Sequence, residues 1–194
     1  DISTTNAAAA PYGNEVIFLF MGGFMIGLAI EKWNLHKRIA LSIVKVTGTS
    51  GNRIVLGFVL ATGLISMWLS NIATTMMMFP IAVSVIKVIG EGRSEKDMRN
   101  FSLCLMLAIA YASNFGGVAT IIGTPPNVAY VSYMNKRFGQ EISFFDWMVV
   151  CLPVALLLML SLYLVTVKIL FRNQIASSAE TRQLIANELQ QLGP

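Results

Sequence analysis

The chain has 194 residues, of which 55% are hydrophobic and only 12% are charged. A soluble domain usually carries about a quarter charged residues, so this composition indicates a surface that largely avoids water. The net charge of +4 comes without a basic stripe interleaved with aromatic residues, which argues against a nucleic-acid partner. Several apolar runs approach the roughly 20 residues that a helix needs to cross a bilayer. We therefore expect an all-α integral membrane protein.

The N-terminal part of the chain changes from a polar loop to two different kinds of helix. Residues 1–14 are small and polar and predict a loop. Residues 15–52 predict a scaffold helix, apolar over 15–30, followed by an amphipathic helix over 31–48 in which charged and apolar residues alternate. Such a pattern is typical of a helix that lies at the membrane surface. His36 falls in this second segment, and we interpret it as an interfacial residue rather than a ligand or base.

Residues 53–90 hold two apolar arms separated by the polar pair Ser70 and Asn71. The first arm is short for a membrane crossing, so we predict a re-entrant hairpin with this pair at its tip; two ordinary spans are the alternative. Thr62, Ser66 and Ser70 recur every four residues, which places three hydroxyls on one helix face. Hydroxyls in membrane helices often bond to the preceding turn. Irregular backbone at membrane depth, in contrast, must be buried in protein or line a wet cavity.

Residues 101–134 predict a helix that is broken in the middle. The pair Gly116 and Gly117 is followed by the run GTPPN at 123–127, and adjacent prolines interrupt a helix. A break exposes carbonyl groups at one half-helix and N–H groups at the other. Carbonyl, hydroxyl and amide oxygens suit Na⁺, whereas N–H groups at a helix N-terminus suit a carboxylate. Transporters use broken helices in this way, although a structural kink and close helix packing are simpler explanations.

The C-terminal part predicts a transmembrane helix over 147–171 and a cytoplasmic connector over 172–194. Lysine and arginine concentrate in three segments that this layout places on one side of the membrane, 31–53, 87–100 and 168–182. The opposite loop, 135–146, carries only two basic residues. The positive-inside rule therefore places the three basic segments in the cytoplasm.

The sequence shows no arrangement typical of an enzyme. The two cysteines, Cys104 and Cys151, lie in apolar runs and predict small buried side chains. There is no nucleophile paired with a base and no cluster with metal-ligand spacing. No acidic or basic residue lies well inside an apolar arm. We therefore expect neutral oxygens and helix dipoles to be the binding elements.

Two motifs, MWLSNIATTMMMFPI at 67–81 and GGVATIIGTPPNVAY at 116–130, give the chain a resemblance to the divalent anion:sodium symporters of the INDY type. The resemblance extends from about residue 15 to about residue 170, and the ordered pair of motifs makes it specific. It implies sodium-coupled transport of a dicarboxylate such as succinate across the inner or plasma membrane, by a multi-pass protein.

The resemblance also implies which residues form the site. Sodium would be bound by Ser66, Ser70, Asn71 and Gly123. The substrate carboxylates would contact Ser70, Asn71, Thr124 and Pro125. The sequence departs from the family at Ile72, where a threonine is usual.

The family fold consists of two inverted repeats, each with one hairpin and one broken helix. This chain supplies one repeat, so the resemblance implies a partner in a second half of the transporter, and a homodimer of the whole protein. Transport of sulfate, tartrate or another anion within the same superfamily is one alternative. A membrane scaffold fragment without transport activity is the other.

Overall fold

The computed structural model of the protein describes residues 13, 15–48, 50–90, 95–171 and the positions 175, 183, 185–187 and 189–190. All regular secondary structure in this part of the chain is helical, which confirms the predicted fold class at the level of an all-α protein. The predicted loop 1–14 and connector 172–194 lie almost entirely outside it. The elements are α2 (Glu15–Lys32), α3 (Leu35–Thr47), α4 (Gly51–Ser66), α5 (Asn71–Gly90), α6 (Glu95–Val118), η2 (Ile121–Gly123), α7 (Pro125–Phe138), α8 (Phe144–Leu164) and the π-helical η3 (Val165–Leu170).

Three of the described segments are long and apolar enough to cross a membrane: Asn71–Gly90, Glu95–Val118 and Phe144–Leu170. Helix α4 is shorter, with 16 residues. At 1.5 Å per residue it extends about 24 Å, which is less than the ~30 Å thickness of a hydrocarbon core. Helices α5, α6 and α8 (with η3) therefore match a full crossing in length, and α4 does not.

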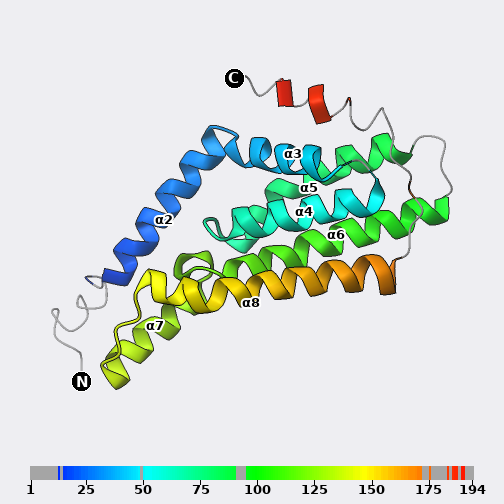
Figure 1. Ribbon diagram of the computed structural model, residues 1–194. Helices are drawn as coiled ribbons and strands as arrows, with labels where there is room; N and C mark the ends of the chain where they lie inside the picture. Colours follow the sequence, from blue (N-terminus) through cyan, green and yellow to red (C-terminus); the bar gives the residue numbers. More distant parts are fainter. Residues whose placement is uncertain are drawn as a thin grey trace, which may run out of the picture.

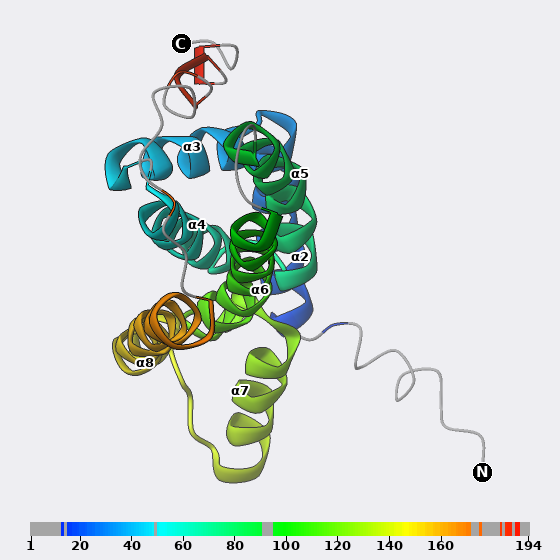
Figure 2. The ribbon, with the colours of Figure 1, turned by 90° about the vertical axis from the view of Figure 1, so that its right-hand side faces the viewer.

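Helix α6 forms the centre of the bundle. It packs against α4, α5 and α8, which run beside it in Figure 1 and surround it in the end-on view of Figure 2. Large side chains from these helices fill the core, among them Phe58, Met78, Phe101, Leu105 and Ile109. Helix α7 leaves the bundle at the end where α8 begins (Figure 1). The motif-bearing segments thus meet on the central helix.

Helix α3 packs along α4 through one face only, formed by His36, Ala40, Leu41 and Val44. The chain turns from α2 into α3 at Asn34, whose φ of 51° and ψ of 24° are left-handed. Asparagine tolerates this conformation better than most residues. The amphipathic pattern of the sequence is thereby explained by packing on α4, and the position of α3 at the membrane surface stays a prediction.

Helices α4, α6 and α8 come into close contact at two glycines. A Cβ atom at Gly116 would overlap the backbone of Gly63, and a Cβ atom at Gly63 would overlap the Sδ atom of Met159. Small residues allow membrane helices to approach so closely. The contact fixes the end of α4 against the end of α6, where both predicted motifs lie.

Three helix boundaries differ from the sequence prediction. Helix α6 begins at Glu95 rather than near residue 101, since its acidic first turn complements the helix dipole. It continues through Gly116 and Gly117, so that the interruption falls later, between Val118 and Pro125. Helix α8 begins at Phe144 rather than residue 147, because Ser143 caps it by accepting a hydrogen bond from the Asp146 N–H.

Candidate ion and substrate site

The tip, which is the turn that joins α4 to α5, separates residues that the sequence placed on one helix face. Helix α4 ends at Ser66, and the turn at 67–69 leads to Ser70, which precedes α5. The Ser70 hydroxyl accepts a hydrogen bond from the Ala73 N–H at 3.3 Å, as a helix N-cap does. Ser70 therefore belongs to the start of α5, and the predicted row of three hydroxyls is wrong because the turn ends α4 before the third.

Three oxygen atoms from α4, α5 and α6 converge beside the tip. The hydroxyl Oγ of Ser66 lies 2.9 Å from Oδ1 of Asn71 and 2.6 Å from the carbonyl oxygen of Ser113. Ser66 is completely buried. Its single hydroxyl proton can satisfy only one of the two acceptors. One lone pair of the Asn71 or Ser113 oxygen therefore stays open beside Ser66, an arrangement that suits a cation.

Backbone forms one wall of this oxygen cluster. A Cβ atom at Gly117 would overlap Oδ1 of Asn71, and a Cβ atom at Gly123 would overlap the carbonyl oxygen of Gly117. Glycine is therefore required at both positions if the groups are to approach as they do. The structure thus brings Ser66 and Asn71 into direct contact. Gly123 packs against Gly117, which in turn packs against Asn71.

The helix break is tied to the tip by the side chains of Thr120 and Asn127, which were not among the predicted site residues. The Thr120 hydroxyl donates to the carbonyl oxygen of Met67 at 2.5 Å and accepts from the Gly123 N–H at 3.0 Å. The amide of Asn127 donates to the carbonyl oxygens of Gly117 and Thr120 at 2.9 and 2.8 Å. Both side chains are buried. The signal in the sequence was their position, as polar residues inside an interrupted apolar run.

Helix α8 also contacts the break. The indole Nε1 of Trp147 donates to the carbonyl oxygen of Val118 at 2.9 Å. Nearby, the ring of Trp68 at the tip lies 6.3 Å from the ring of Phe144, measured between centroids. The first turn of α8 therefore lies beside both motifs.

The start of α7 does not offer the N–H groups that a broken helix was expected to supply. Pro125 and Pro126 occupy its first positions and have no N–H, and the Asn127 N–H donates to the carbonyl oxygen of Thr124 at 3.1 Å. The start of α5 carries no proline. The first N–H groups of a helix have no acceptor within it, so α5 provides the better end for an anion, at Asn71 and the following residue.

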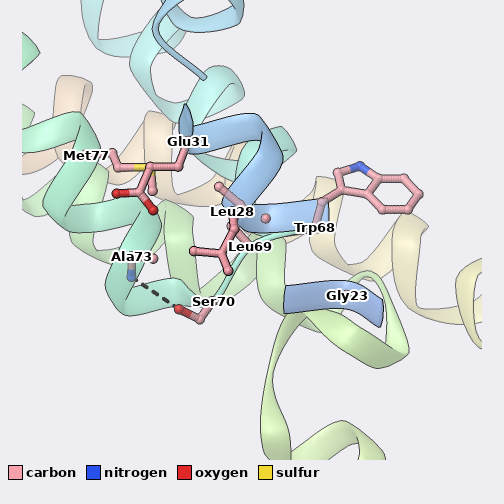
Figure 3. Close-up of a pocket in the computed structure, with 9 residues that line it drawn as sticks. Gly23, Leu28, Glu31, Trp68, Leu69, Ser70, Ala73 and Met77 are labelled. Carbon is pink, nitrogen blue, oxygen red and sulfur yellow. Dashed lines mark hydrogen bonds between the residues drawn. The ribbon is translucent and has the colours of Figure 1, made fainter. Parts of the chain in front are cut away.

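A cavity of about 310 Å³ lies on the other side of the tip, against α2. Its lining is largely apolar, and Figure 3 shows Ser70, Leu69 and Ala73 of the hairpin opposite Leu28 and Glu31 of α2. The only ionisable side chain in the lining is that of Glu31. A carboxylate and apolar walls do not suit a dianion, so we do not assign this cavity to the substrate.

Two further buried hydroxyls lie close in the chain to Ser66 and Asn71. Thr62 on α4 and Thr74 on α5 are completely buried, and neither hydroxyl has a hydrogen-bond partner among the described residues. A buried hydroxyl without a partner costs about 1–3 kcal/mol. Helices α4 and α5 thus each carry a buried hydroxyl without a partner among the described residues.

Residues 1–186 match the family described as citrate transporter, CitMHS. The chain belongs to the citrate transporter family. This membership agrees with the expectation of a membrane protein, since three of the described helices are long and apolar enough to cross a bilayer. It also confirms the predicted resemblance to anion transporters.

The curated relatives of the chain are much longer than the chain itself. The sodium-dependent dicarboxylate transporter SdcS of Staphylococcus saprophyticus is 40% identical over 189 residues, which are 95% of this chain and 36% of the relative. The protein of the same name from Staphylococcus aureus is 39% identical over 196 residues, which are 99% of this chain and 38% of the relative. The chain therefore spans just over a third of the length of these relatives.

Proposed function

We propose that this chain forms the ion-binding half of a site for sodium-coupled dicarboxylate transport. The observation that carries the proposal is the convergence of the Ser66 hydroxyl, the Asn71 amide oxygen and the Ser113 carbonyl oxygen in a buried cluster. The names of the relatives, sodium-dependent dicarboxylate transporters, indicate sodium as the ion and a dicarboxylate as the substrate.

Sodium would be held by neutral oxygens at the hairpin tip. Ser66 and Asn71 provide two of them, and Gly123 closes the site from the break through its contact with Gly117. Ser70 would contribute from the turn, where it caps α5. No Asp or Glu lies among these residues, so that each oxygen contributes a partial charge and binding is reversible.

The substrate carboxylate would lie at the N-terminal end of α5. The dipole of α5 is positive there, and the Asn71 amide offers both a donor and an acceptor. Ser70 lies at the same end, and Thr124 and Pro125 would approach from the break. Thr124 would act through its hydroxyl, since the prolines after it have no N–H.

The architecture of the whole transporter is also part of the proposal. Helix α4 is too short for an ordinary crossing, whereas α5 is long enough for one; the short arm supports a re-entrant hairpin formed by the two helices. The relatives are more than twice as long as this chain, which supports a second repeat with its own hairpin. That repeat would complete the site, and two copies of the whole protein would form a homodimer in the plasma membrane.

The proposal is tested by uptake of labelled succinate into proteoliposomes that contain the full-length protein. Sodium should stimulate uptake, and Ser66→Ala should remove most of the stimulation because it deletes one oxygen of the cluster. Ser161→Ala is the matched control, since Ser161 is an exposed serine on α8 whose hydroxyl bonds only within its own helix. Equal sodium stimulation in the two variants would refute the assignment of the cluster.

A tricarboxylate is the second candidate substrate, because the matching family is described as citrate transporter. Competition with unlabelled succinate, citrate, sulfate and tartrate in the same proteoliposomes ranks the anions directly. We expect succinate to compete most strongly, and a stronger effect of citrate would transfer the proposal to a tricarboxylate.

A further inference from the structure

The polarity of the Asn71 amide decides whether the oxygen cluster can accept a cation. An asparagine side chain presents an acceptor oxygen at one end and two donors at the other. In the structure Oδ1 faces the Ser66 hydroxyl and the glycine wall at Gly117. If the amide were turned over, its NH₂ group would occupy this place and repel a cation. Some feature of the protein must therefore select one orientation.

A chain of hydrogen bonds leads from Asn71 to a group that can only accept. Nδ2 of Asn71 donates to Oδ1 of Asn114 at 3.1 Å, and Nδ2 of Asn114 donates to the carbonyl oxygen of Ala110 at 2.8 Å. A backbone carbonyl has no proton to give. Ala110 therefore fixes the orientation of the Asn114 amide, and Asn114 in turn fixes that of Asn71.

We propose that Asn114 is a positioning residue that turns the Asn71 oxygen toward the cluster and thereby sets its preference for sodium. The Asn114 side chain bonds to Asn71 and to the Ala110 carbonyl rather than to the cluster itself, and it is exposed. Its role is to bind the NH₂ group of Asn71, so that Oδ1 of Asn71 faces the cluster. This inference rests on the proposed sodium-coupled function and adds to it a residue outside the predicted site.

Two properties of α6 make this arrangement specific. Asn114 lies four residues after Ala110, so that its side chain reaches back over one helical turn to the carbonyl. The neighbouring Ser113 donates its own hydroxyl to the same carbonyl at 2.9 Å. The Ala110 oxygen therefore accepts from two side chains in addition to its helical N–H partner, and a reversed Asn114 would place two acceptors against each other.

The test measures the sodium dependence of substrate uptake by the full-length transporter in proteoliposomes. Asn114→Leu removes both hydrogen bonds at similar side-chain length. It should raise the sodium concentration for half-maximal uptake about fivefold, the change that corresponds to one lost hydrogen bond, while the maximal rate at saturating sodium is retained. Asn114→Asp keeps an acceptor for Asn71 but loses the donor to the Ala110 carbonyl, so it should restore part of the sodium affinity. Asn135→Leu, at an exposed asparagine on α7, is the matched control.

The outcomes separate this inference from the proposed function. An Asn114→Leu transporter with unchanged half-maximal sodium, or with only a lower maximal rate, would overturn the positioning role. An aspartate variant as impaired as the leucine variant would overturn it as well. If the wild-type protein transports without sodium, the proposed function fails before any variant is compared. Asn114→Ser, which is too short to reach Asn71, replaces the leucine variant if the latter does not fold.

Discussion

Replacement of Gly117 by alanine tests whether the backbone wall controls the ion site. The added Cβ would occupy the place of the Asn71 Oδ1 atom, so the amide must move away. Two hydrogen bonds of that amide are then lost, to Ser66 at 2.9 Å and to Asn114 at 3.1 Å. At about 1 kcal/mol each they amount to about 2 kcal/mol, which corresponds to a roughly 30-fold increase in the sodium concentration for half-maximal uptake.

The global stability should change much less than the sodium response. An alanine favours a helix over glycine by about 0.5–1 kcal/mol, which offsets part of the loss. Gly22→Ala is the control, because a Cβ atom there meets no other atom within 4 Å, and it should leave the sodium response unchanged. The assay is succinate uptake at varied sodium, together with thermal unfolding in choline chloride. A Gly117→Ala transporter with wild-type sodium dependence would refute the reasoning.

Three further variants test separate features of the structure. Asn127→Leu removes two donors from the carbonyls of the break and should lower the unfolding temperature and the uptake rate together; an unchanged unfolding temperature would contradict this. Ser143→Ala removes the cap of α8 and should cost about 1 kcal/mol in chemical unfolding with transport retained. Burial lowers the pKa of His36 below 6.5 despite its hydrogen bond to a backbone carbonyl. The unfolded chain then binds the proton first, so stability should fall as the pH drops below about 6.5, and His36→Gln should lose this dependence.

The sequence was sufficient for the class of protein and for the positions of the turn between α4 and α5 and of the break after α6. Low charge and long apolar runs predicted a helical membrane protein, and polar residues inside apolar runs marked the tip and the break. These signals are local, because each interruption of a membrane helix must appear as proline, glycine or polar residues at that point.

The contacts within the site could not be predicted, because they depend on how α4, α5 and α6 pack. The Ser66 hydroxyl meets the carbonyl oxygen of Ser113, 47 residues further along the chain, and no spacing rule encodes that approach. Helical periodicity also placed Ser70 with Ser66, although the turn at 67–69 assigns it to α5. The roles of Thr120 and Asn127 likewise follow from carbonyl groups that are exposed only once the helix is broken.

The glycine contacts around Asn71 have a mechanical consequence. A pocket lined by side chains can open when one of them changes rotamer, but the atoms at Gly117 and Gly123 are main-chain atoms with no such freedom. An ion enclosed there would leave by displacement of the hairpin relative to the break. The hydrogen bond from Thr120 to the Met67 carbonyl joins the tip to the break, so it would have to be broken in such an opening of the site.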